Sequence, residues 1–181
     1  MQNHHHPVKE LSNIHVSRRP GFITQGLLRA GQKIHRCALG RSGIGIKRGE
    51  GDGITPIGRF GIEGALVRPD KHMPRHLRLP ARTIEPHLGW CDAVGDRNYN
   101  QLVPLPYPVS HENLWRDDHL YDVALIMDFN RSRRLSLGGS AIFFHLAHDD
   151  YRPTEGCVAV SRRDMLALLP RIGPETKIVI S

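Results

Sequence analysis

A histidine and a cysteine twelve residues apart are the side chains of this sequence whose chemistry is easiest to specify. His145 ends an apolar run and Cys157 follows a polar turn, in the segment FFHLAHDDYRPTEGCVAV. An imidazole beside a thiol favours the thiolate, which is the form of cysteine that attacks a carbonyl carbon. The spacing therefore permits a Cys-His nucleophilic pair, provided that a strand, a loop and a return bring the two side chains together.

Cys157 has a simpler interpretation as a small buried residue beside Val158 and Val160, because free cysteines are often buried. The neighbouring Glu155 also opposes the catalytic interpretation, since a carboxylate close to a thiol raises the thiol pKa. A nucleophilic Cys157 requires the Glu155 side chain to point away. Spacing alone leaves the catalytic and the buried interpretations open.

A mixed zinc site is a third interpretation of the same region. Its imidazole and thiolate ligands would come from His145, His148, Cys157 and His119. No pair among these residues has a recognised short ligand spacing, and the 3 cysteines of the chain form no C-x-x-C pair. We therefore expect neither a metal nor an organic cofactor.

Two features beside Cys157 favour a nucleophile at this position. Gly156 allows the backbone to aim nearby N–H groups at one point, as an oxyanion hole requires. Ser161, with Asp164 three residues later, has the form of a helix capping box and predicts a helix over residues 162–169. The positive end of that helix would favour a thiolate if it pointed toward the sulfur.

The elements that must position these residues are mostly strands. The 18 glycines and 13 prolines indicate many turns rather than long helices. Apolar segments bounded by turn signals predict strands within residues 26–43 (a pair), 59–62, 120–129, 138–147 and 176–181. The strands of 120–129 and 138–147 should be neighbours. Residues 67–108 are rich in Pro, Arg and His and predict a long irregular insert that forms a lid or substrate wall.

Length and charge bound the classes of protein and partner. The 181 residues suit one domain, and the net charge of +7 favours anionic partners. The basic residues are scattered and aromatic residues make up only 6%, so we expect no nucleic-acid binding. No apolar run has the length of a signal peptide or a membrane span, so we expect no transmembrane segment.

The region around the cysteine resembles the L,D-transpeptidases with a YkuD-type catalytic domain. The hallmark of that family is a histidine on a strand, followed by a loop and an [S/T]-H-G-C segment. His145, Thr154, Gly156 and Cys157 match this pattern, and DGITPIGRF resembles the T-P-x-G-x-F stretch of the family. The resemblance extends over residues 26–181.

The resemblance implies a mainly β fold. We expect one YkuD-like β-sandwich or barrel domain over residues 23–181, with one helix after the nucleophile and the long irregular insert. Residues 1–22 are expected to be a disordered N-terminal segment.

The resemblance also implies a peptidoglycan L,D-transpeptidase as the activity. Cys157 would attack the stem-peptide carbonyl that follows diaminopimelate, release D-alanine and hold the peptide as a thioester. An amine of a neighbouring stem would then take the acyl group. His145 would act as base and then as acid, oriented by a main-chain carbonyl at Leu146.

Three departures from the family pattern concern the acceptor side of the pocket. Glu155 replaces the histidine before Gly-Cys, Ala159 replaces a polar residue, and the loop between His145 and Cys157 is short. The inserted segment over residues 89–122 is also unlike the commonest members and resembles a divergent subgroup that carries T-E-G-C. That subgroup joins the first residue of one stem to the third of another, which implies the L-alanine amine as acceptor. A carboxypeptidase or amidase that uses water, and a non-catalytic wall-binding module, remain alternatives.

Further substrate contacts are expected from Thr154, Glu155, His148, Arg97 and Tyr99. His148 shares a strand end with His145, and the Arg97 guanidinium could grip a carboxylate in a bidentate fork. Tyr99 has the simpler interpretation of a packing anchor. The substrate places the protein in the periplasm or cell envelope, whereas the absence of a visible signal peptide would suit the cytoplasm.

Overall fold

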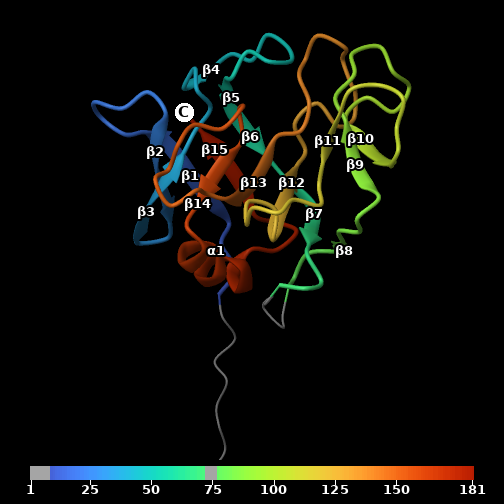
Figure 1. The fold of residues 1–181 in the computed structure, drawn as a ribbon. Coiled ribbons are helices and arrows are strands. Elements are labelled where there is room, and N and C mark those ends of the chain that lie inside the picture. The colour runs from blue at the N-terminus through green and yellow to red at the C-terminus, as the bar shows by residue number, and fades with distance from the viewer. Residues whose placement is uncertain (1–8, 72–76) are drawn as a thin grey trace, which may run out of the picture.

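The computed structural model describes residues 9–71 and 77–181, which form a mainly β structure around one curled sheet (Figure 1). The sheet has ten strands, and the order is β6-β15-β1-β2-β3-β14-β13-β12-β7-β8. In that order their bounds are Gly58–Phe60, Lys177–Ile180, Asn13–Arg18, Gln25–Ala30, Lys33–Ala38, Val158–Val160, Phe143–Leu146, Val123–Met127, Ile62–Val67 and Ala81–Thr83. The predicted mainly β fold is confirmed.

Two small sheets flank the large one. The first has the order β10-β9-β11, with bounds Gln101–Pro104, Leu88–Cys91 and His111–Asn113. The second pairs β4 (Ile44–Gly45) with β5 (Thr55–Pro56). Figure 1 shows the three-stranded sheet on one side of the large sheet, beyond β12 and β7.

The helix α1 (Arg162–Leu168) follows β14 directly and continues into a 3-10 turn, η1 (Leu169–Arg171). The hydroxyl of Ser161 accepts a hydrogen bond of 3.1 Å from the Asp164 N–H, which satisfies a donor that the helix itself leaves unpaired. Ser161 is therefore the N-cap, and the predicted helix is confirmed. Within the described residues, no helix is long and apolar enough to cross a membrane.

The two faces of β13 and β14 bury different side chains, because successive residues of a strand point to opposite faces. Phe144, Leu146 and Val158 belong to the larger core, which also packs the underside of α1. Phe143 and Cys157 belong to a second cluster that includes Trp90 of the insert. The sheet thus has a core on one face and the insert on the other.

The strand predictions hold for the hairpin β2–β3, for the neighbours β12 and β13, and for the C-terminal strand β15. The prediction of disorder through residue 22 is wrong for residues 13–18. These form β1, which lies between β15 and β2 and fully buries Ile14 and Val16. Residues 1–8 lie outside the described part of the chain.

The insert is less irregular than its composition suggests. The predicted stretch of residues 67–108 contains β8, β9 and β10, although residues 72–76 lie outside the described part. The sequence does not predict these short strands, because Pro and Gly interrupt the alternation of apolar and polar residues. Trp90 anchors β9 by packing edge-on against Phe143 of the large sheet, with ring centroids 5.0 Å apart.

Candidate active site

The parallel pairing of β13 and β14 places His145 and Cys157 on the same face of the sheet. His145 lies opposite Ala159 in the register, and the Cys157 sulfur accepts a hydrogen bond of 3.3 Å from the N–H of Phe143. Alternation then puts the side chains of residues 143, 145, 157 and 159 on one face. A connection over residues 147–157 replaces the simple return of a hairpin, because parallel strands need a crossover.

His145 is buried and its orientation is fixed by its own backbone neighbour. Its Nδ1 lies 2.9 Å from the Leu146 carbonyl oxygen, and the side chain is 4% exposed. A carbonyl can only accept, so Nδ1 carries the proton and Nε2 keeps a free lone pair. The Tyr121 ring meets the imidazole edge-on, with centroids 5.1 Å apart, and limits its rotation.

The thiol of Cys157 is enclosed by backbone groups. It accepts from Phe143 and donates to the Ala141 carbonyl at 3.2 Å. Ala141 has a φ of +51°, a left-handed conformation that is uncommon for alanine and that occurs preferentially at functional sites.

Burial sets the protonation state of both groups. Desolvation raises the pKa of Cys157 to about 12, and the nearby Glu112 charge acts in the same direction. Desolvation also lowers the pKa of His145 to about 4. At neutral pH the resting pair is therefore a neutral thiol and a neutral imidazole.

The loop before Cys157 is held by Thr154. Its hydroxyl donates to the Cys157 carbonyl at 2.7 Å and accepts from the Gly156 N–H at 3.2 Å. Gly156 has a φ of +136°, and a Cβ there would lie 2.8 Å from the Ile54 carbonyl oxygen, so only glycine fits. Because Thr154 already binds the Gly156 N–H, this geometry favours a positioning role for Gly156 over the predicted role in an oxyanion hole.

The segment DGITPIGRF, residues 52–60, positions the same loop through hydrogen bonds. The buried Thr55 hydroxyl accepts a hydrogen bond of 2.8 Å from the Gly40 N–H. Gly40 in turn forms an isolated parallel bridge with Thr154. A chain of contacts thus runs from Thr55 through Gly40 and Thr154 to Cys157.

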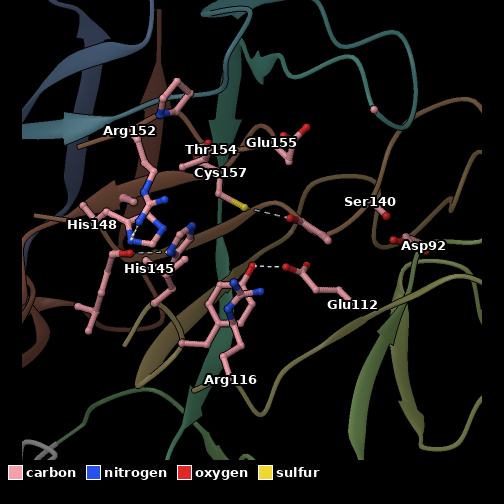
Figure 2. A pocket seen from close by; sticks show the side chains of 18 of the residues that line it. Asp92, Glu112, Arg116, Ser140, His145, His148, Arg152, Thr154, Glu155 and Cys157 are labelled. Carbon is pink, nitrogen blue, oxygen red and sulfur yellow. Dashed lines mark hydrogen bonds between the residues drawn. The ribbon is translucent and has the colours of Figure 1, made fainter. Parts of the chain in front are cut away.

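A cavity of about 550 Å³ opens above the two strands and contains both His145 and Cys157 (Figure 2). It is lined by residues of four regions of the chain. These are Glu50 and Gly51; Asp92; Ser110, His111, Glu112, Arg116, Leu120 and Tyr121; and, from the sheet and its loops, Ser140, Ala141, His145, Leu146, Ala147, His148, Arg152, Pro153, Thr154, Glu155, Cys157 and Ala159. Asp92 of the stretch predicted as a substrate wall, together with residues 110–121 that follow it, therefore forms one wall of the site.

The predicted substrate contacts divide into two groups. Thr154, Glu155 and His148 line the cavity, whereas Arg97 and Tyr99 do not. Arg97 is exposed away from the cavity, and the buried Tyr99 donates its hydroxyl to Glu50. The cavity therefore gives no support for direct substrate contact by these last two residues, and the prediction stays untested.

The Glu155 side chain is directed away from the sulfur, as a nucleophilic Cys157 requires. Its carboxylate forms an ion pair with Arg41 and is 76% exposed. The carboxylate that raises the thiol pKa is Glu112 instead. Glu112 accepts a hydrogen bond of 2.6 Å from the Tyr121 hydroxyl, and burial raises its own pKa.

Sequence reasoning missed Arg116, Arg152, Tyr121 and Glu112 as cavity residues. The Arg116 guanidinium lies in the cavity wall and donates two hydrogen bonds, of 2.9 and 2.7 Å, to the Asp118 carboxylate. Arg152 contacts His148 through a hydrogen bond of 3.1 Å. No motif marks these residues, since the fold of the insert alone brings 112–121 next to β13.

The zinc interpretation finds no support in the geometry. Within residues 9–71 and 77–181, no three His, Cys, Asp or Glu side chains are grouped as a metal ion requires. His119 instead bonds the Ala147 carbonyl through Nε2 at 2.9 Å and packs edge-on against His148.

Comparison with known proteins gives one family. A model described as the L,D-transpeptidase catalytic domain, YkuD, matches residues 14–180. No curated protein and no solved structure matches the chain.

Proposed function

Because this chain belongs to the family of YkuD-type L,D-transpeptidase catalytic domains, we propose that it is a cysteine acyltransferase that cross-links peptidoglycan stem peptides. One observation carries the proposal. Cys157 and His145 come from adjacent parallel strands and face one cavity. The Leu146 carbonyl accepts the proton on His145 Nδ1, so Nε2 is free to act as a base. A thiol and a free imidazole base that face one cavity are groups that nucleophilic catalysis by a thiol uses.

The first half-reaction forms a thioester. Cys157 Sγ attacks the carbonyl carbon that follows diaminopimelate in a stem peptide, and His145 Nε2 takes the thiol proton. The bond to the terminal D-alanine nitrogen then breaks, and the imidazolium returns the proton to that nitrogen. D-Alanine leaves and the stem stays on the sulfur.

The second half-reaction transfers the acyl group to an amine. The amine nitrogen attacks the thioester carbon, His145 takes the proton that the nitrogen loses, and the Cys157 sulfur departs and recovers a proton. The T-E-G-C segment supports the L-alanine amine of a neighbouring stem as the acceptor, which gives cross-links from a first to a third residue.

The neutral resting pair bears on how the first half-reaction proceeds. A buried thiol with a pKa of about 12 is not ionised before substrate binds. Proton transfer to His145 therefore accompanies attack, because the forming C–S bond withdraws electron density from the sulfur and makes the thiol proton more acidic. The low pKa of His145 keeps the imidazole available as a base throughout the neutral range.

The negative charge of the substrate matches two arginines that line the cavity. A stem peptide bears carboxylates on diaminopimelate and on the terminal alanine, and the Arg116 and Arg152 guanidinium groups line the cavity. Guanidinium groups bind carboxylates in a planar, bidentate geometry. Since peptidoglycan is the substrate, we place the enzyme at the cell envelope.

The test is intact-protein mass spectrometry during incubation with purified tetrapeptide muropeptides, for wild type and Cys157→Ala, with the released products analysed in parallel. We expect an adduct that depends on Cys157, together with dimeric muropeptides whose fragmentation identifies the amine. An adduct with trimmed monomers alone would identify a carboxypeptidase. If neither an adduct nor a product forms, the alternative of a wall-binding module is favoured.

A further inference from the structure

The charges that line the cavity are separated across the nucleophile. Figure 2 shows Arg152 and His148 on one side of the Cys157 sulfur, and Ser140 and Asp92 together on the other side. Glu50 and Glu112 also line the cavity. A ligand that spans the site therefore meets cations at one end and carboxylates at the other.

The carboxylates differ from the other acidic groups near the site because they lack cationic partners. Among the described residues, no Lys, Arg or His nitrogen lies within 4.0 Å of a carboxylate oxygen of Glu50, Asp92 or Glu112. By contrast, Asp118 pairs with Arg116, and Asp52 pairs with Lys47. Glu50 and Glu112 instead accept hydrogen bonds from the neutral hydroxyls of Tyr99 and Tyr121. Glu50 and Asp92 thus contribute negative charge at this end, whereas Arg116 lies near enough to Glu112 to act on its charge.

Two oxygen atoms at this end have no hydrogen-bond partner in the described part of the chain. They are Asp92 Oδ1 and Ser140 Oγ, and Ser140 is only 4% exposed. Burial raises the pKa of Tyr99, and Ser140 acts on that phenol in the opposite direction, yet Ser140 Oγ forms no hydrogen bond of normal geometry with it. Buried oxygens without a partner destabilise the protein, so a ligand that supplies hydrogen-bond donors here gains affinity.

The required ligand group is small, cationic and rich in donors. The carboxylates do not converge into a group that could hold a metal ion, again within the described residues. A primary ammonium group is a compact charge with three donors and no acceptor. We propose that Asp92 and Ser140, with Glu50 beside them, form a subsite for a primary ammonium group of a stem peptide. This inference deepens the proposed function and rests on it for the identity of the ligand.

Stem peptides contain this group in two places. One is the side-chain amine of diaminopimelate, which the donor stem presents close to the scissile bond. The other is the L-alanine amine, which belongs to an acceptor stem. In either case the charge pattern orients the peptide, with the carboxylate of the terminal alanine toward Arg152 and its ammonium group toward Asp92.

The test measures binding in the absence of chemistry, by calorimetry on Cys157→Ala protein. The probes are a free tetrapeptide stem and two derivatives, each acetylated at one of the two amines. Adding Asp92→Asn, which preserves shape but removes the charge, should weaken binding of the free stem about 10-fold. Ser140→Ala should weaken it less, because a neutral hydroxyl contributes less than a carboxylate.

The matched control is Asp117→Asn, an exposed aspartate of the same insert that does not line the cavity. It should leave the affinity unchanged. Acetylation of the amine that occupies the subsite should abolish the difference made by Asp92→Asn, and the derivative that does so identifies the source of the ammonium group. Equal affinity of Asp92→Asn and its parent for the free stem, or an equal loss with both acetylated stems, would overturn the subsite.

Failure of the proposed function gives a different result. If wild-type protein forms no thioester, the activity is wrong, yet the binding difference persists because it needs no thiol. If the thioester forms and Asp92→Asn has no effect on binding, the activity stands and the subsite is wrong.

Discussion

The two walls of the cavity are built on opposite principles. The sheet wall, β13 and β14, presents His145 and Cys157 with 4% and 7% exposure, both bonded to main-chain groups and both neutral at rest. The insert wall presents Glu112 and Arg116, which are held by side chains, and Asp92, whose Oδ1 has no partner among the described residues. Reactivity thus comes from backbone geometry and burial, whereas recognition comes from side chains that can change without altering the sheet.

The largest effect is expected from the sheet wall. Cys157→Ala should lower cross-linking at least about 10⁴-fold, since no other group can hold the acyl intermediate. Cys157→Ser should be nearly as inactive, although its hydroxyl can keep the hydrogen bonds to Phe143 and Ala141. Product analysis of muropeptides gives the rates, and circular dichroism should show both variants folded. Substantial activity in Cys157→Ala would refute the assignment of the nucleophile.

His145→Gln should lower the rate about 10²- to 10⁴-fold, through loss of the general base. It should also change how stability depends on pH. The folded pKa of about 4 lies below the unfolded value of 6.5, so the unfolded state binds more protons between these values. The stability of the wild type is therefore lost as pH falls from about 6.5 to 4, by up to about 3 kcal/mol from this group.

Urea unfolding of both proteins at pH 7 and pH 4.5 measures this difference. The free energy of unfolding should fall less for His145→Gln than for wild type over that interval. An equal fall in both proteins would contradict a buried neutral imidazole at this position.

Tyr121→Phe addresses the junction of the two walls. The hydroxyl bonds Glu112 at 2.6 Å, while the ring packs on His145. Removing the hydroxyl leaves a buried carboxyl without its donor, so the free energy of unfolding should fall by about 1–3 kcal/mol. Because the ring remains, the rate should change less than in His145→Gln. If the rate falls as far as in that variant, the hydroxyl has a role in the chemistry.

The smallest effect is expected from Arg116 of the insert wall. Arg116→Gln should raise KM about 10-fold with little change in kcat, because it removes a contact to a substrate carboxylate. Arg97→Gln is the matched control, since Arg97 does not line the cavity, and it should leave both constants unchanged. Steady-state kinetics with a soluble stem peptide measures both variants. A larger effect from Arg97→Gln would restore the role that the sequence suggested.

The same division explains which features the sequence could predict. The strands around β12 and β13, the capped helix and the pair His145 and Cys157 follow from local signals, namely apolar runs, a capping box and a short spacing. Arg116 and Glu112 could not be predicted, because their approach to β13 depends on docking of the three-stranded sheet through Trp90 and Phe143. The partner of Tyr99 could not be predicted either, because a tyrosine in a loop gives no indication that its hydroxyl binds Glu50. Strand β1 was missed since its pairing with β15 joins residues far apart in the sequence.

The position of β15 makes two distant segments of the chain depend on each other. This strand, residues 177–180, lies inside the ten-stranded sheet, between β6 and β1. Without β15, β1 would become an edge strand with unpaired N–H and C=O groups, and β6 would lose the strand that joins it to the sheet. Residues 13–18 and 177–180 therefore stabilise each other, although they are far apart in the sequence.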